Sequence, residues 1–139
     1  MLRGGLIAAA LVFCGAALAQ APFYQGRTLT ILVGFPPGGG YDIYARILSK
    51  YLGKRLPGEP QVIVQNMPGA GSLTAANAIY NTLPRDGTVF GVTHRFVPLM
   101  PLLNIKGAQF DPLKFTYIGS VNREIGLCIA MKSAGFTSM

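Results

Sequence analysis

The sequence predicts an α/β fold with a mostly parallel sheet flanked by helices. Strand-like and helix-like segments alternate along the chain, and glycine-rich loops follow the first two strand-like segments. This alternation is typical of β-α-β units, whose strands are parallel. Half of the 139 residues are hydrophobic, so the chain can bury enough apolar surface to form one compact domain.

The first predicted unit starts with a strand from Thr28 to Phe35. Its nearly continuous apolar run indicates burial on both faces of a parallel sheet. A helix follows the glycine loop, carries basic residues near its end and stops at Pro57-Gly58. The apolar residues at helical spacing, which predict its buried face, are Ile43, Ile47, Leu48, Tyr51, Leu52 and Leu56.

The second predicted unit repeats this order. A strand from Gln61 to Gln65 leads through a glycine-rich loop to a helix from Leu73 to Tyr80, with Ser72 as its N-cap and Tyr80 in the core. A Pro-Arg-Asp-Gly turn precedes a third strand from Thr88 to Thr93.

The pattern is less regular beyond the third strand. We expect a short helical piece around Val97 to Leu103 and two more strands, Phe115 to Val121 and Gly126 to Met131. Cys128 lies in the last of these runs, where a small buried hydrophobe is a better interpretation than a nucleophile.

Residues 1–19 predict a secretory signal peptide. A basic Arg3 precedes an apolar stretch, and Ala17-Leu18-Ala19 matches the small-x-small cleavage pattern. Export is therefore expected. The net charge is +7, but the basic residues are scattered rather than clustered, so we predict no nucleic-acid partner. A positive surface would attract an anionic ligand.

The run Gly38-Gly39-Gly40 stands where a buried strand gives way to a helix. Ligands of parallel α/β sheets bind at the carboxyl ends of the strands, and a helix N-terminus favours an anion. Asp42 is then expected to cap the helix and order the loop. The loop lacks the lysine of a nucleotide-binding P-loop and the third glycine of a dinucleotide fingerprint, so a plain structural turn stays open as the alternative.

A resemblance to a known family covers roughly Phe23 to Ile118. It is carried by the Pro-Pro-Gly-Gly run at Pro36 to Gly39, by Asp42 and Arg46, by the Asn-x-Pro-Gly-Ala-Gly loop at Asn66 to Gly71, and by Asp86-Gly87. In these motifs the chain resembles the N-terminal part of the substrate-binding proteins of tripartite tricarboxylate transporters, the Bug or TctC family.

The resemblance implies a periplasmic protein with two lobes, a Venus flytrap, that closes on a small carboxylate and delivers it to membrane permease subunits. It implies no cofactor, no metal and no enzyme activity. The loop at the start of the first helix would hold the carboxylate, and two other loop ends would lie nearby. The ligand-binding residues implied are Pro37, Gly38, Gly39, Gly40, Tyr41, Asp42, Gly71, Ser72, Thr93 and His94.

Members of that family are well over twice as long as this chain. With the signal peptide at 1–19, the resemblance therefore implies an N-terminal lobe at 20–124 and a truncated crossover at 125–139, with the second lobe missing.

The alternative from another class is an exported α/β enzyme that uses the glycine-rich loop as an oxyanion or phosphate site. An enzyme needs a nucleophile and base or an acid and base at suitable spacing. The single histidine, the five acidic residues and Cys128 show no such spacing. An interaction module of a sensor system is a third interpretation.

Overall fold

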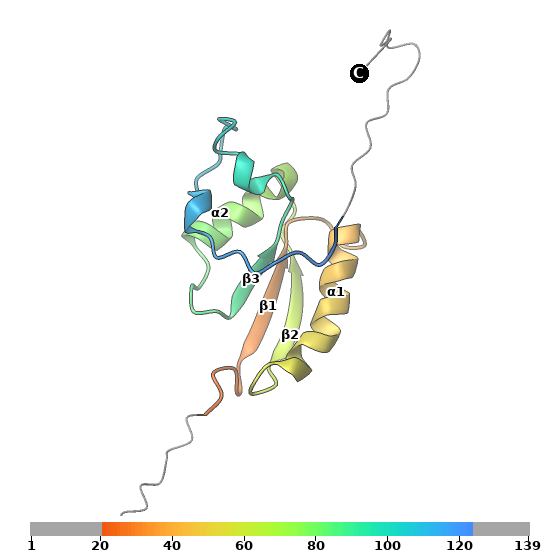
Figure 1. Ribbon diagram of the computed structural model, residues 1–139. Coiled ribbons are helices and arrows are strands. Elements are labelled where there is room, and N and C mark those ends of the chain that lie inside the picture. Colours follow the sequence, from red (N-terminus) through yellow and green to blue (C-terminus); the bar gives the residue numbers. More distant parts are fainter. Residues whose placement is uncertain (1–20, 124–139) are drawn as a thin grey trace, which may run out of the picture.

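The computed structural model describes residues 21–123 (Figure 1). Its regular elements are β1 (Thr28–Val33), α1 (Gly40–Leu52), β2 (Gln61–Asn66), α2 (Leu73–Asn81) and β3 (Val89–Val92). The first three predicted strands and both predicted helices are confirmed, with small shifts at their ends. The signal peptide, the strand at 126–131 and Cys128 lie outside the described residues.

The three strands form a parallel sheet in the order β2-β1-β3. The chain passes from β1 through α1 to β2 on one side. It then passes from β2 through α2 to β3 on the other side of β1. Because β-α-β crossovers are right-handed, these opposite directions place the two helices on opposite faces of the sheet. Figure 1 shows α1 and α2 on its two sides. The predicted α/β fold class is confirmed.

The register brings the carboxyl ends of all three strands together. Val33 is paired with Asn66 of β2 on one side and with Val92 of β3 on the other. The loops after these strands therefore start side by side at one edge of the sheet. That edge is where a parallel α/β sheet binds ligands.

The core has one cluster on each side of the sheet. On the α1 side, Ile31, Val33 and Ala45 are buried and are surrounded by half-buried apolar side chains. The other cluster contains Leu73, Ala76, Val97 and Phe110, with Tyr80 packed against it as expected.

The predicted buried face of α1 is wrong in part. Ile43, Ile47 and Tyr51 are 50%, 53% and 58% exposed. Leu48 does pack against the sheet, together with Ala45 and Tyr41. The helix is thus rotated toward its smaller residues, because Ala45 allows the close approach that a larger side chain would prevent. A 3-10 turn at Gly53–Arg55 follows its last residue.

The predicted strand Phe115 to Val121 does not form. After a 3-10 turn at Pro112–Lys114 this segment runs without ladder hydrogen bonds, and Tyr117 and Ile118 are 62% and 80% exposed. Its apolar, β-branched composition met the local criterion for a strand, but a strand also needs a paired neighbour. The helical piece near Val97 to Leu103 is shorter than predicted, a 3-10 turn at Val97–Leu99 followed by turns.

Candidate functional site

The loop between β1 and α1 is organised by a hydrogen bond from its own helix. Gly38 has φ of +86°, a conformation that favours glycine, and its N–H donates to Asp42 Oδ2 at 2.8 Å. Gly39 is the N-cap of α1, and its carbonyl accepts from the N–H of Ile43 at 3.0 Å. The N–H groups of the first helical turn have no partner within a helix, so those at Gly40 and Tyr41 are directed out of its N-terminus.

Two of the three glycines are not required by the packing of the loop. Gly39 has an ordinary extended conformation, and an added Cβ there would meet only the Pro36 carbonyl oxygen at 3.7 Å. An added Cβ at Gly40 would meet nothing within 4 Å. Only Gly38 is explained by backbone conformation. Because Gly39 and Gly40 carry no side chain, a bound molecule could approach the backbone closely at these two residues.

Asp42 is the centre of a buried polar network. Its side chain is 2% exposed, and its carboxylate also accepts from Arg46 Nε and from Asn66 Nδ2, each at 2.8 Å. Asn66 Nδ2 donates in addition to the carbonyl of Phe35 at 3.0 Å, and Arg46 donates to Asn66 Oδ1 at 3.2 Å. The loops after β1 and β2 are thereby joined to the first turn of α1.

These contacts keep Asp42 ionised. The hydrogen bonds from Arg46, Gly38 and Asn66 hold the pKa of its carboxyl far below the usual range, and they outweigh the opposing effect of burial. The same ion pair raises the pKa of Arg46. The negative charge is thus compensated inside the loop. Asp42 orders the loop as expected, but it is not the N-cap, which is Gly39.

Ser72 joins the ends of β1 and β3. Its hydroxyl donates to the carbonyl of Gly34 at 3.2 Å and accepts from the N–H of His94 at 3.1 Å. Ser72 is fully buried and stands at the N-cap position of α2, but with φ of 75° and no capping hydrogen bond. The prediction that Ser72 caps α2 is therefore wrong: the residue stands at the N-cap position, but its hydroxyl bonds to the backbone after β1 and after β3 instead of to the helix.

Aromatic side chains gather at the same edge. The rings of Phe35 and Tyr41 stack with centroids 4.5 Å apart, and His94 stacks on Phe96 at 5.2 Å. The His94 ring lies 6.3 Å from that of Tyr41, so the two stacks are neighbours. His94 Nδ1 accepts from the N–H of Phe96 at 3.2 Å, which fixes the orientation of the imidazole.

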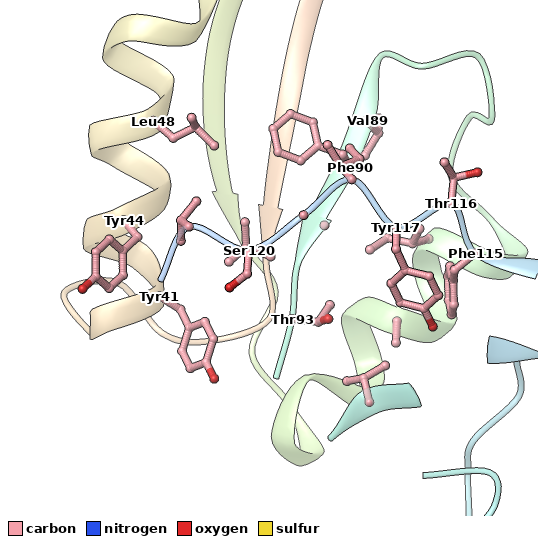
Figure 2. A pocket seen from close by; sticks show the side chains of 18 of the residues that line it. Tyr41, Tyr44, Leu48, Val89, Phe90, Thr93, Phe115, Thr116, Tyr117 and Ser120 are labelled. Carbon is pink, nitrogen blue, oxygen red and sulfur yellow. The ribbon is translucent and has the colours of Figure 1, made fainter. Parts of the chain in front are cut away.

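An open groove lies between α1, the β3 edge of the sheet and the segment 114–122 (Figure 2). It includes four of the predicted site residues, Gly40, Tyr41, Thr93 and His94. The other six lie beside it, either exposed on the loops or buried beneath them: Pro37, Gly38, Gly39, Asp42, Gly71 and Ser72.

Sequence reasoning left several residues out of the site. Arg46 and Asn66 belong to the motifs of the family resemblance but not to the predicted site, and Tyr44, which lines the groove, is absent from that prediction. The spacing of four between Asp42 and Arg46 on a helix indicates an ion pair. No local signal connects Asn66 with Asp42, because their contact depends on the pairing of β2 with β1. Residues 21–123 hold no group of three or more histidine, cysteine or acidic side chains that could bind a metal.

Comparison with known proteins agrees with the fold. A solved structure titled as that of a periplasmic transporter matches 63% of this chain and 28% of its own, with a TM-score of 0.52 and 28% identity. A UPF0065 protein from the gbd 5′ region of Cupriavidus necator is 34% identical over 115 residues, 81% of this chain. BugT of Bordetella pertussis is 43% identical over 63 residues, 45% of this chain.

The described residues therefore form an α/β lobe of the periplasmic binding-protein type. The chain belongs to the family of Bug and UPF0065 proteins. It spans about a third of the length of the Cupriavidus relative, 34%, and the match to BugT covers 19% of that protein. No family model matches the chain.

Proposed function

We propose that this chain supplies a ligand-binding lobe of a periplasmic solute-binding protein, which captures a small carboxylate for a transporter of the tripartite tricarboxylate type. The observation that carries the proposal is the first turn of α1. It directs backbone N–H groups outward at Gly40 and Tyr41, beside two glycines that the packing of the loop does not require.

The network at Asp42 supports this proposal electrostatically. A carboxylate in the first turn of a helix would repel a bound anion. Here Arg46 lies 2.8 Å from Asp42 Oδ2, and the Gly38 N–H and Asn66 donate to the same carboxylate. The ion pair of Asp42 and Arg46 is close to neutral as a unit, so the N–H groups of Gly40 and Tyr41 stay available to an anion.

The remaining parts of the proposal rest on the family. Residues 1–19 would be the signal peptide that directs export to the periplasm, 20–124 the lobe and 125–139 the start of a crossover toward a second lobe. The second lobe would close on the ligand, and membrane permease subunits would receive it. Within residues 21–123, no helix is long and apolar enough to cross a membrane.

The enzyme alternative finds less support in the geometry. Ser72 is fully buried and its hydroxyl is engaged by Gly34 and His94 backbone groups. His94 Nδ1 accepts a backbone N–H and so is not free to act as a base at that atom. A nucleophile activated by this pair would require both contacts to break.

Gly39→Val tests the proposal, because valine suits the extended conformation at this position while its side chain would cover the N–H groups. Calorimetry with succinate, citrate and benzoate is expected to show binding to the wild-type chain and none to the variant. Asp42→Ala is expected to abolish binding as well. Gln65→Val, at an exposed position on β2, is the matched control and should bind normally. Unchanged affinity in both site variants would refute the loop assignment.

A further inference from the structure

We propose that the groove beside the α1 N-terminus receives the aromatic body of a monocarboxylate. This inference rests on the proposed function, since it takes the carboxylate to lie at the first turn of α1. It adds the class of ligand, which neither the family nor the fold specifies.

The groove and the first turn of α1 are one continuous surface. Gly40 and Tyr41, whose N–H groups lead out of the helix, are themselves part of the groove lining. From there the groove extends past Tyr44 and Leu48 of α1 toward β3, below the segment that carries Ser120 (Figure 2). A carboxylate at the helix N-terminus would therefore have the rest of its molecule inside the groove.

The inner surface suits a flat apolar body. Leu48, Phe90 and Val92 form an apolar floor that continues the core cluster on this side of the sheet. At the mouth, the rings of Tyr41 and His94 lie 6.3 Å apart and are inclined at 48°. Aromatic rings prefer offset or edge contacts at such separations, so an aryl group would find partners on both.

The charges around the groove fit an anion with a single carboxylate. The charged side chains in its lining among residues 21–123 are Arg85, Arg95 and Lys114, and all three are cationic. This field attracts an anion to the groove. Lys114 is paired with Asp111 at 3.6 Å, Arg85 donates to the carbonyl of Tyr80, and Arg95 lies over the ring of Phe96. A second or third carboxylate would therefore lie mainly against the apolar floor, where desolvation of an ion is costly.

The groove has room for an aryl body. Its volume is about 1220 Å³. Pockets for small molecules usually measure about 300–1,000 Å³, so size excludes none of these ligands, and the preference for an aryl group rests on the apolar floor and on the rings of Tyr41 and His94.

Binding of benzoate, 3-phenylpropionate, succinate, citrate and neutral benzamide to the full chain tests the inference by nuclear magnetic resonance titration. The two aryl carboxylates are expected to bind about tenfold more tightly than succinate or citrate. Tyr44→Ala, at a half-exposed position, should weaken benzoate binding several-fold, and Tyr41→Ala about tenfold. Tyr51→Ala is the matched control, because Tyr51 is exposed on α1 outside the groove.

The possible results separate this inference from the proposed function. Succinate or citrate binding as tightly as benzoate, with sensitivity to Gly39→Val, would overturn the aryl preference and leave the carboxylate site standing. Failure of every carboxylate would overturn both. Binding of benzamide as tightly as benzoate would refute the carboxylate site at the first turn of α1. Dimerisation that Tyr44→Ala abolishes would show that a second copy of the chain occupies the groove.

Discussion

Asn66 Nδ2 donates to Asp42 Oδ1 at 2.8 Å, and the same amide nitrogen donates to the carbonyl of Phe35 at 3.0 Å. One side chain at the end of β2 thus joins the start of α1 to the loop after β1. The bond reaches across 24 residues of sequence and depends on the parallel pairing of β1 with β2. It ties the geometry of the glycine loop to the sheet rather than to the loop's own residues.

Asn66→Ala should therefore affect both stability and binding. Loss of the hydrogen bonds made by this half-buried amide is expected to lower the free energy of unfolding by about 2 kcal/mol, measured by urea denaturation. Carboxylate affinity should fall about tenfold, because the glycine loop loses its anchor to β2. Gln65→Ala, next to it on the exposed side of β2, should change stability by less than about 0.5 kcal/mol. Equal effects of the two substitutions would argue against an anchoring role.

The ionisation of Asp42 predicts a dependence of stability on pH. Its pKa is lowered in the folded chain by Arg46, Gly38 and Asn66, so its contribution is complete above the ordinary aspartate pKa of about 4. That contribution is lost as the pH falls through the lowered pKa. Asp42→Asn should be less stable than wild type at neutral pH and should lose less stability on acidification.

Urea midpoints measured from neutral pH down to about pH 2 check this prediction. Asp86 contributes a similar dependence on pH in the wild type and in Asp42→Asn, because hydrogen bonds from Thr88 lower its pKa. The difference between wild type and variant isolates Asp42. Parallel curves would show that the network does not favour the charged form.

Ser72→Ala should be destabilising although the change is small in volume. The variant leaves the half-buried N–H of His94 without its acceptor and the Gly34 carbonyl without its donor, which costs about 1–3 kcal/mol. Ser49→Ala is the control, since that hydroxyl donates only to the Arg46 carbonyl of its own helix. Thermal unfolding should show a lower midpoint for Ser72→Ala alone. Similar midpoints for both would mean that the bridge between β1 and β3 contributes little.

The glycines that follow β1 are expected to divide into two kinds. An added Cβ at Gly34 would collide with Cβ and Oγ of Ser72, which is itself fixed by two hydrogen bonds, so Gly34→Ala should lower stability strongly. Gly40→Ala meets no atom within 4 Å and lies in α1, so its stability should be unchanged or raised. Calorimetry should nevertheless show weaker carboxylate binding for Gly40→Ala. Normal binding would mean that the backbone at Gly40 does not approach the ligand.

Much of the fold could be predicted because its signals are local. The apolar run that forms β1 is bounded by glycine and proline, the same holds for β2, and a Pro-Arg-Asp-Gly turn precedes β3. The glycine loops mark where β1 and β2 end, so their common edge of the sheet followed from parallel topology alone. On the described chain this edge does bring Tyr41 and His94 together.

The parts that could not be predicted depend on tertiary contacts. The left-handed conformation of Ser72 follows from the close approach of Gly34, which no local pattern contains. The segment Phe115 to Val121 has a strand-like composition but no partner in the described sheet. The buried face of α1 was predicted wrongly in part for a similar reason, because apolar residues lie on more than one side of the helix and only packing against the sheet decides between them.

The rotation of α1 leads to a prediction that the sequence pattern alone would reverse. Ile47 is 53% exposed, whereas Leu48 packs against the core cluster that contains Ile31 and Val33. Ile47→Ala should change the free energy of unfolding by less than about 0.5 kcal/mol, while Leu48→Ala should lower it by about 2 kcal/mol. Urea denaturation of the two variants at equal concentration measures both. Because the residues are adjacent in one helix, propensity effects nearly cancel, and a larger loss at Ile47 would place the buried face of α1 where the sequence pattern had put it.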